Sequence, residues 1–218
     1  MPPRGLEPSG VILVDKPAGP TSFDIVAAVR RRTGARTGHA GTLDPFATGL
    51  LLLLSGASTR LQPRFVGLDK RYVTEIDLSA RTSTGDPEGE VVDEHEPPSA
   101  GELGQRLARL EGVVELPIPA ASAVKIEGER AYRLHRRGVV VEMPVRAMTV
   151  RELQLEDYAG GVCRLDLLVS SGTYVRAIAD ALDGHCRTLR RTEIGPFSVE
   201  EADPERVLAP DEALARLG

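Results

Sequence analysis

Residues 38–54 have the sequence GHAGTLDPFATGLLLLL, in which a loop with three glycines runs directly into five leucines. Glycines let a backbone turn tightly and approach a ligand closely, and Asp44 is biased away from helix because Pro45 follows it. The five leucines indicate a strand that is covered on both faces. The segment is therefore expected to present the Asp44 carboxylate and the His39 imidazole ahead of a rigid, buried strand.

The same loop has two other interpretations. A phosphate-binding P-loop does not fit, because no GK[ST] sequence occurs and no helix follows. An ordinary turn around Asp44-Pro45 stays open, since Asp-Pro is common turn chemistry. Taken alone, the residues of the loop fit a turn as well as a site.

The segments that flank the loop have clear strand and helix patterns. Gly10–Pro17 is an apolar run stopped by proline, which predicts a buried strand. Residues 22–33 are predicted to form a helix that is capped by Ser22 and followed by Gly34. Residues 72–78 alternate between inward and outward positions, as in a half-buried antiparallel strand.

The second half of the chain mixes further helix and strand patterns. The predicted elements are a hairpin connection with an exposed loop at 81–98, a helix at 99–111 with a Ser99–Glu102 capping box, an irregular basic stretch at 117–149 with a short helix near 129–137, a strand at 162–169, and helices at 174–182 and 211–217. Because strands and helices do not alternate regularly, we expect an α+β fold with a mixed, mainly antiparallel sheet.

Charges are segregated along a chain whose formal net charge is −5. Residues 20–72 hold eight Arg or Lys and three Asp or Glu, and residues 124–151 hold seven and three. Residues 75–115 instead hold three basic and eleven acidic residues. Such a distribution can form one positive face that attracts a polyanion, although charge runs also occur as solvated surfaces without a partner.

Cysteine use and hydropathy favour the reducing cytoplasm. Cys163 and Cys186 form no CxxC or Cys/His cluster, so neither a disulfide framework nor a zinc site is supported. Residues 1–10 lack an apolar signal core, and Leu50–Leu54 is far shorter than the roughly 20 residues that span a bilayer. A soluble, cytoplasmic protein is expected.

Several motifs occur in an order that is typical of one enzyme family. GHAGTLDPFATGLLLLLSGASTR, which begins at residue 38, resembles the catalytic motif of the TruB family of tRNA pseudouridine synthases. VDKPAGPTSFD at 14–24 resembles the first motif of the family. The later motifs are matched by KRY at 70–72, SAVK at 122–125, SSGTYVR at 170–176 and LRRTEIGPF at 189–197. The resemblance extends in order along nearly the whole chain.

The resemblance implies a fold, a reaction and a domain plan. The expected fold is the pseudouridine-synthase fold, with helices flanking the mixed sheet and a central active-site cleft. The implied activity is isomerisation of uridine 55 in the T-arm loop of tRNA, with Asp44 as the catalytic carboxylate. We expect no cofactor, metal, membrane or obligatory protein partner. The catalytic domain is expected at 1–203 with an RNA-binding thumb at about 120–146, followed by a short tail at 204–218 instead of a full PUA domain.

The same resemblance assigns roles to individual residues. Arg176 matches the arginine that pairs with the catalytic aspartate, and Tyr72 matches the tyrosine that stacks on the target base near its C5 proton. Tyr174 and Leu189 match residues that line the uracil pocket. His39 matches the histidine that fills the stack left by the extruded nucleotide, and Lys16, grouped with these substrate-binding residues, matches a lysine that supports the active-site loop. The residues expected to grip the RNA backbone are Arg30, Arg31, Arg32, Lys125, Arg130, Arg136 and Arg137.

Two alternative functions share these features. One is a synthase of the same fold that acts on another RNA, and the other is a non-catalytic protein that binds or folds tRNA. The combination of Asp44, Tyr72 and Arg176 favours an enzyme, because a protein that only binds RNA does not need these three side chains.

Overall fold

A computed structural model describes residues 9–126 and 128–218 of the chain. It divides into two compact units, one formed by the described residues through Val73 together with Leu189–Gly218, the other by Thr74–Thr188. Residues 1–8 lie outside the described residues. They include the start of the predicted catalytic domain and most of the segment that lacks an apolar signal core. Residue 127, in the predicted thumb, also lies outside the described residues. The domain boundaries given above stay predictions.

The first unit contains a sheet in the order β14-β1-β3-β12-β4, with β2 paired to β3 and β13 to β12. Its strands are β1 (Gly10–Lys16), β2 (Thr37–His39), β3 (Thr48–Ser55), the start of β4 (Lys70–Asp77), the end of β12 (His185–Ile194), β13 (Phe197–Ser198) and β14 (Asp203–Leu208). Its helices are α1 (Ser22–Thr33), α2 (Gln62–Val66), α6 (Pro210–Ala215) and two short 3₁₀ helices at Gly56–Leu61 and Val199–Glu201. β1 and β3 are antiparallel, whereas β12 and β3 are parallel.

The five leucines of β3 form the centre of this unit, as their sequence predicts. All five are 0% exposed. Leu50, Leu52 and Leu54 pack on one face in a cluster that includes the rings of Phe65 and Phe197. The alternate leucines pack on the other face, against apolar side chains of β1 and α1. Burial on both faces makes β3 a rigid continuation of the loop that carries Asp44.

Helix α1 begins as predicted, but its cap is a different residue. Thr21 is the N-cap, and it forms a capping box with Asp24. The prediction that Ser22 caps the helix is wrong, because the acidic residue three positions on selects Thr21 as the cap. Gly34 ends the helix in the left-handed conformation, as expected.

The second unit contains a sheet in the order β12-β4-β11-β10-β7. Its further elements are β5 (Ala80–Thr82), β6 (Val91–Glu94), α3 (Ala100–Ala108), β7 (Gly112–Pro117), β8 (Lys125–Ile126), β9 (Glu129–Arg130), α4 (Ala131–Arg136), β10 (Val145–Ala159), β11 (Val162–Val169) and α5 (Val175–Ala181). The alternation predicted for β4 and β11 is confirmed, because every second residue of each strand is buried. Together with the antiparallel pairs of β10 with β11 and β7, this gives a mixed, mainly antiparallel architecture.

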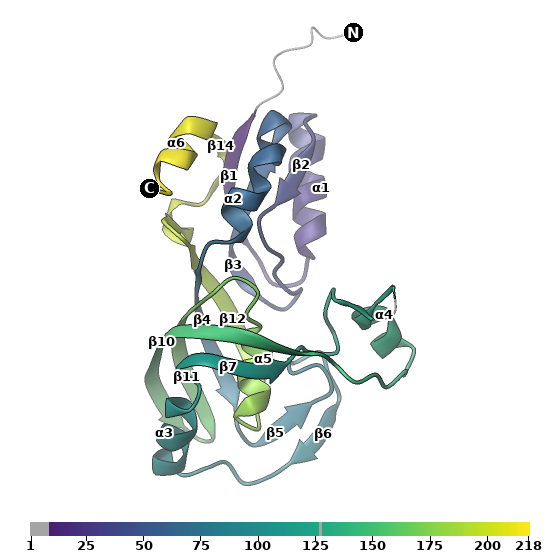
Figure 1. The fold of residues 1–218 in the computed structure, drawn as a ribbon, viewed down its shortest axis with the longest axis vertical. Helices are drawn as coiled ribbons and strands as arrows, with labels where there is room; N and C mark the ends of the chain where they lie inside the picture. The colour runs from purple at the N-terminus through teal and green to yellow at the C-terminus, as the bar shows by residue number, and fades with distance from the viewer. Residues whose placement is uncertain (1–8, 127) are drawn as a thin grey trace, which may run out of the picture. The chain divides into compact units, whose positions relative to one another are not determined.

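Between β7 and β10 the chain makes an excursion, which carries α4 at its tip, away from the sheet of this unit (Figure 1). The short helix α4 lies where the sequence predicts one. Among the residues that the structure describes, β8 and β9 form a separate two-stranded sheet. The excursion is therefore not part of the main sheet of the unit, and it presents the basic side chains of α4 to solvent.

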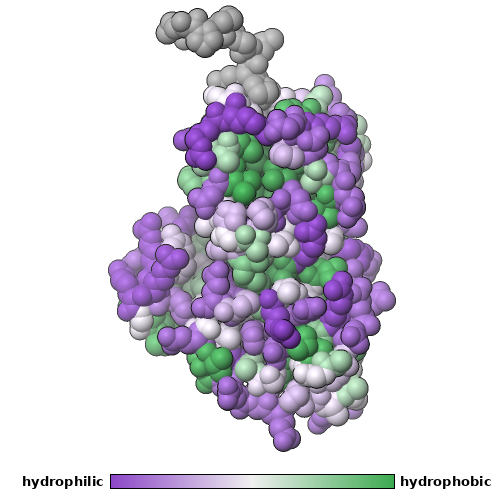
Figure 2. All heavy atoms as spheres, turned by 180° about the vertical axis from the view of Figure 1, so that it is seen from behind, coloured by the Kyte–Doolittle hydropathy of each residue, from purple (hydrophilic) through white to green (hydrophobic). Residues whose placement is uncertain are grey.

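The surface of the described residues carries exposed apolar side chains at scattered positions. Phe23 on α1, Val113 on β7 and Val140 in the loop after α4 are 71%, 71% and 97% exposed. On the face drawn in Figure 2, hydrophilic residues predominate, and separate hydrophobic areas lie between them. No helix formed by residues 9–126 and 128–218 is long and apolar enough to cross a membrane.

Candidate active site

Asp44 lies in the loop between β2 and β3, where its side chain is half-buried. The residue before it is held at both backbone polar groups by one hydroxyl. Ser22 Oγ donates to Leu43 O at 2.8 Å, and Leu43 N donates to Ser22 Oγ at 2.8 Å. Ser22 therefore holds the loop in place, because a buried hydroxyl that satisfies both backbone groups stabilises one backbone conformation.

Lys16 holds the other side of Asp44. Its side chain is 0% exposed, and Nζ donates to the carbonyls of Pro17, Pro20 and Pro45 at 2.8, 2.9 and 3.1 Å. Three carbonyl oxygens disperse the charge of a buried ammonium group. This geometry fits the supporting role expected for Lys16, and a contact with substrate stays a prediction.

Arg191, in β12, ties both ends of the loop together and was not singled out from the sequence. It is 1% exposed, and its guanidinium donates to Leu50 O at 2.7 Å, Gly41 O at 3.1 Å and Thr42 O at 3.3 Å. Strand alternation was the available signal, since Arg191 shares the inward face of β12 with Leu189. Gly49 has φ 102°, and a Cβ there would lie 2.2 Å from Arg191 O, so the loop needs a glycine at that position.

Besides Lys16, the structure places three predicted substrate-binding residues in the first unit. Tyr72 and Leu189 are 8% and 7% exposed, and the Arg191 guanidinium carbon lies 6.0 Å from the centre of the Tyr72 ring. His39 is half-buried, and its Nδ1 accepts a hydrogen bond from Gly41 N at 3.2 Å. Burial first, and then the charge of Arg191, lower the pKa of His39 below its usual value. A neutral imidazole is therefore favoured at physiological pH.

The second unit holds Arg176 and Tyr174 at the start of α5. Tyr174 is half-buried at the N-cap, while Arg176 is 4% exposed. Arg176 Nη1 donates to Thr84 O at 2.7 Å and Nη2 donates to Ala121 O at 3.0 Å. The guanidinium is thus fixed in orientation by backbone carbonyls.

Asp86 is a further buried charge beside Arg176, and it was missed in the sequence. Its Oδ2 lies 3.6 Å from Arg176 Nη1, and the two side chains are 7% and 4% exposed. Asp86 Oδ1 also accepts hydrogen bonds from Thr84 Oγ1 and Glu88 N. Its place in Gly85-Asp86-Pro87, within an acidic loop, has the pattern of an ordinary turn. The only sequence signal was a carboxylate between glycine and proline, which does not reveal a partner 90 positions away.

A pocket of about 250 Å³ adjoins Arg176 in the second unit. It is lined by residues of the β5–β6 hairpin, of the segments after β7 and before β10, and of α5; they include Arg81, Thr84, Ile118, Met143 and Asp180. The lining combines apolar side chains with polar and charged ones, and ligand pockets join apolar surface to polar groups that fix the orientation of the ligand.

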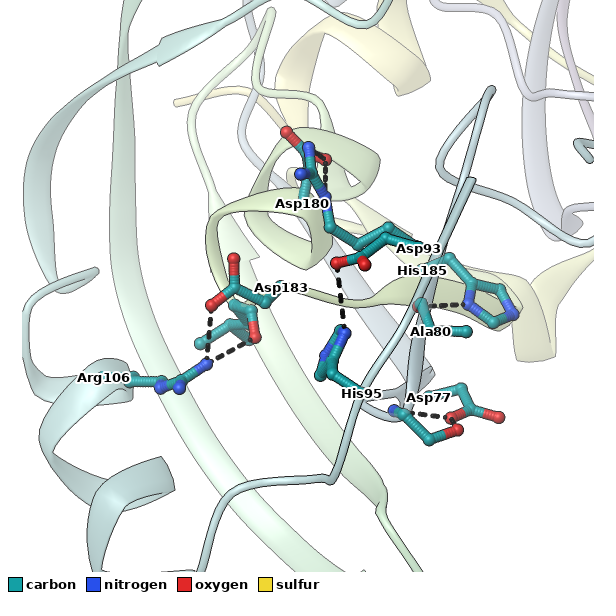
Figure 3. A network of polar contacts seen from close by, with 11 residues as sticks. Asp77, Ala80, Asp93, His95, Arg106, Asp180, Asp183 and His185 are labelled. Atoms are coloured by element: carbon teal, nitrogen blue, oxygen red, sulfur yellow. Dashed lines mark hydrogen bonds and ion pairs between the residues drawn. The ribbon is translucent and has the colours of Figure 1, made fainter. Parts of the chain in front are cut away.

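Polar contacts fix α5 within the second unit (Figure 3). Arg106 of α3 donates to Leu182 O at 3.1 Å and to Asp183 Oδ2 at 2.9 Å, at the turn that follows α5. Asp183 has φ 62°, a strained conformation for a residue with a side chain. On the helix itself, Asp180 Oδ1 accepts a hydrogen bond from Arg81 Nη2 at 2.7 Å. The helix that carries Arg176 is thus anchored at its end.

The residues predicted to grip RNA are exposed, and several have partners. Arg30, Arg31 and Arg32 form the last turn of α1, where Arg32 binds Glu205. In the excursion, Arg137 binds Glu129 at 2.8 Å, Arg130 donates to Ala123 O, and Arg136 lies over the ring of Tyr132. Lys125 is exposed on β8. Arg133, not singled out before, lies over the same tyrosine ring.

The predicted pair of Asp44 with Arg176 joins residues of different units and stays a prediction. Within the part of the chain that the structure describes, no three His, Cys, Asp or Glu side chains are grouped so that they could hold a metal ion.

Sequence comparisons identify related proteins. The family model for the N-terminal domain of TruB family pseudouridylate synthase matches residues 30–175. The tRNA pseudouridine synthase B of Leifsonia xyli subsp. xyli is 43% identical over 226 residues, which cover 96% of this chain and 75% of that protein. The protein of the same name from Thermobifida fusca is 43% identical over 212 residues, which cover 88% of this chain and 72% of that protein.

Solved structures confirm the fold. A chain in the crystal structure of a Cbf5-Nop10-Gar1 complex has a TM-score of 0.68 at 26% identity over 88% of this chain. This chain spans 50% of the length of that one. A crystal structure of pseudouridylate synthase has a TM-score of 0.53 at 17% identity, covering 98% of this chain and 75% of that one. The likeness confirms the predicted fold, with its mixed, mainly antiparallel sheet and helices.

Proposed function

The chain belongs to the TruB family of pseudouridylate synthases, and from that premise we propose that it isomerises uridine 55 in the T-arm loop of tRNA with Asp44 as the catalytic carboxylate. It is an isomerase that makes pseudouridine in tRNA. The match of the family model over residues 30–175 carries this conclusion. The choice of Asp44 is supported by the hydrogen bonds that fix the backbone of its loop.

The reaction makes one main demand on the protein. The C1′–N1 glycosidic bond breaks, the uracil turns, and a C1′–C5 bond forms. C5 then loses its proton and N1 gains one, so the isomerisation leaves the composition unchanged. One group must assist the cleavage and the rejoining. A carboxylate can attack as a nucleophile or stabilise a cationic sugar. Asp44 is the carboxylate in a loop whose neighbouring backbone is fixed by Ser22, Lys16 and Arg191, and its own side chain remains half-exposed. Both routes, attack and electrostatic assistance, are open to this group.

The other site residues have supporting roles in the proposal. Arg176 pairs with the Asp44 carboxylate and orients it, since a guanidinium can donate two parallel hydrogen bonds to a carboxylate. Tyr72 stacks on the flipped uracil near C5, while Tyr174 and Leu189 line the pocket. A neutral His39 suits its expected place in the base stack, because placing an uncharged ring between bases avoids the larger cost of desolvating a charge.

Access to the base requires extrusion from folded RNA, which costs a few kcal/mol. Stacking on aromatic side chains offsets this by about 1–3 kcal/mol per base. The exposed arginines of α1 and of the excursion around α4 supply phosphate contacts that hold the T arm. The enzyme acts in the cytoplasm, where its tRNA substrate is found.

The experiment that tests this function uses an unmodified tRNA transcript and a matched transcript with cytidine at position 55. Pseudouridine is mapped by chemical sequencing after incubation with the protein. The proposal expects one new pseudouridine, at position 55 of the first transcript and absent from the second. Modification at another position or in another RNA alone would identify a synthase of different specificity. Binding of tRNA without any pseudouridine would identify a non-catalytic tRNA-binding protein.

A further inference from the structure

The hydroxyl of Ser22 has no role in capping helix α1. Thr21 is the N-cap, and its side chain and Asp24 already form a complete capping box. Ser22 is instead 1% exposed, and its Oγ bonds both N and O of Leu43, 21 positions along the chain. One side chain therefore fixes the two polar groups of the residue that immediately precedes Asp44.

The loop around Asp44 depends on such outside support. Gly41 and Gly49 have φ values of 135° and 102°, so the loop is bounded by residues with little conformational restriction of their own. Between them, Lys16 and Gly19 N hold the carbonyl of Pro45. On the N-terminal side of Asp44, the hydrogen bonds of Ser22 hold the backbone of Leu43 in the same way.

We propose that Ser22 is a positioning residue for Asp44, whose hydroxyl fixes the backbone of Leu43 and thereby the carboxylate that acts on the target nucleotide. The inference rests on the proposed function, because it assigns Ser22 a role in the rate of that reaction. Displacement of a reacting group by about 1 Å can slow an enzyme about 100-fold. A hydroxyl that binds no RNA should therefore control turnover while leaving affinity for tRNA unchanged.

Ser22→Ala removes both hydrogen bonds and retains the Cβ atom. Alanine is also favourable in a helix, so α1 keeps its first turn and its Thr21 cap. The matched control is Ser58→Ala, which removes the hydroxyl of another buried serine in the first unit. Ser58 is 2% exposed, and its Oγ has no hydrogen-bond partner among the described residues. The two variants therefore differ in whether the lost hydroxyl contacts the Asp44 loop.

The test measures single-turnover pseudouridine formation, tRNA affinity, and hydrogen exchange at the Leu43 amide, all well below the melting temperature of each protein. Ser22→Ala is expected to react about 10- to 100-fold more slowly than wild type, with unchanged affinity and faster exchange at Leu43. Ser58→Ala is expected to match wild type in all three measurements.

A Ser22→Ala rate equal to wild type would overturn the proposal, as would a rate loss matched by an equal loss of affinity or by failure to fold. Absence of activity in the wild-type protein would instead refute the proposed function. The exchange rate of Leu43 would still report whether Ser22 holds the loop, so the two failures are distinguishable.

Discussion

Replacing Asp86 by asparagine should destabilise the second unit, because the substitution removes a buried negative charge that lies beside the guanidinium of Arg176. The two charges are 3.6 Å apart and only 7% and 4% exposed, which corresponds to about 4–5 kcal/mol at an effective dielectric constant of about 20. Arg176 keeps its bonds to two backbone carbonyls, and asparagine keeps an acceptor for Thr84 and Glu88. We therefore expect a loss of about 3 kcal/mol, at the low end for a broken buried pair.

The matched control is Asp180→Asn, which makes the same change in an exposed ion pair of the same unit. Asp180 and Arg81 are closer, at 2.7 Å, but 46% and 39% exposed. Solvent screening limits such a pair to about 0–1 kcal/mol. Distance alone thus predicts the larger loss for Asp180→Asn, whereas burial predicts it for Asp86→Asn.

Urea denaturation of the three proteins, followed by circular dichroism, measures the free energies of unfolding. A loss of about 3 kcal/mol corresponds to a fall of about 6–12 °C in melting temperature for a protein of this size. An Asp86→Asn variant no less stable than Asp180→Asn would refute the reasoning, since burial would then have no influence on the contribution of the pair.

Three further predictions concern charge and cofactors. Burial first, and then the charge of Arg191, lower the pKa of Lys70 from 10.5 to about 8. Between these pH values the folded protein binds fewer protons than the unfolded chain. Its free energy of unfolding, compared with that of Lys70→Met, should therefore rise from pH 8 to 10.5. A flat difference between the two denaturation series would contradict that pKa. Neutralising Arg136 and Arg137 with glutamine should weaken tRNA binding and reduce the slope of log K against log salt, whereas Arg164→Gln on β11 should leave the slope unchanged; equal slopes for all three proteins would remove α4 from the RNA interface. Exhaustive chelation should leave turnover unchanged, because the isomerisation involves neither redox change nor hydrolysis; loss of activity that added metal restores would contradict this.

The fold was predictable where one local signal decided the structure. The leucine run gave a buried strand, and the capping box of Ser99 with Glu102 gave α3, although the helix ends at Ala108 instead of residue 111. Strand β10 was missed because only two of its 15 residues are buried, so no apolar alternation marks it.

The sequence motifs predicted which residues belong to the candidate site, but not the tertiary contacts that hold them. Neighbouring hydroxyls at Thr21 and Ser22 offer two possible caps, and the choice between them depends on Asp24 and on a bond to Leu43 that local sequence does not contain. The pair of Asp86 with Arg176 is a tertiary contact of the same kind. Long-range polar contacts of this sort leave no periodic pattern in the sequence.

The most direct test of the catalytic role of Asp44 compares single-turnover pseudouridine formation with a tRNA-binding titration for Asp44→Asn. Asparagine keeps the size of the side chain and removes its charge and nucleophilicity, while phosphate contacts and base stacking continue to determine affinity. The rate should fall by several orders of magnitude with tRNA affinity and melting temperature close to wild type, and Asp211→Asn on α6 should behave as wild type. A folded Asp44→Asn protein that forms pseudouridine at the wild-type rate would contradict the assignment of Asp44 as the catalytic carboxylate.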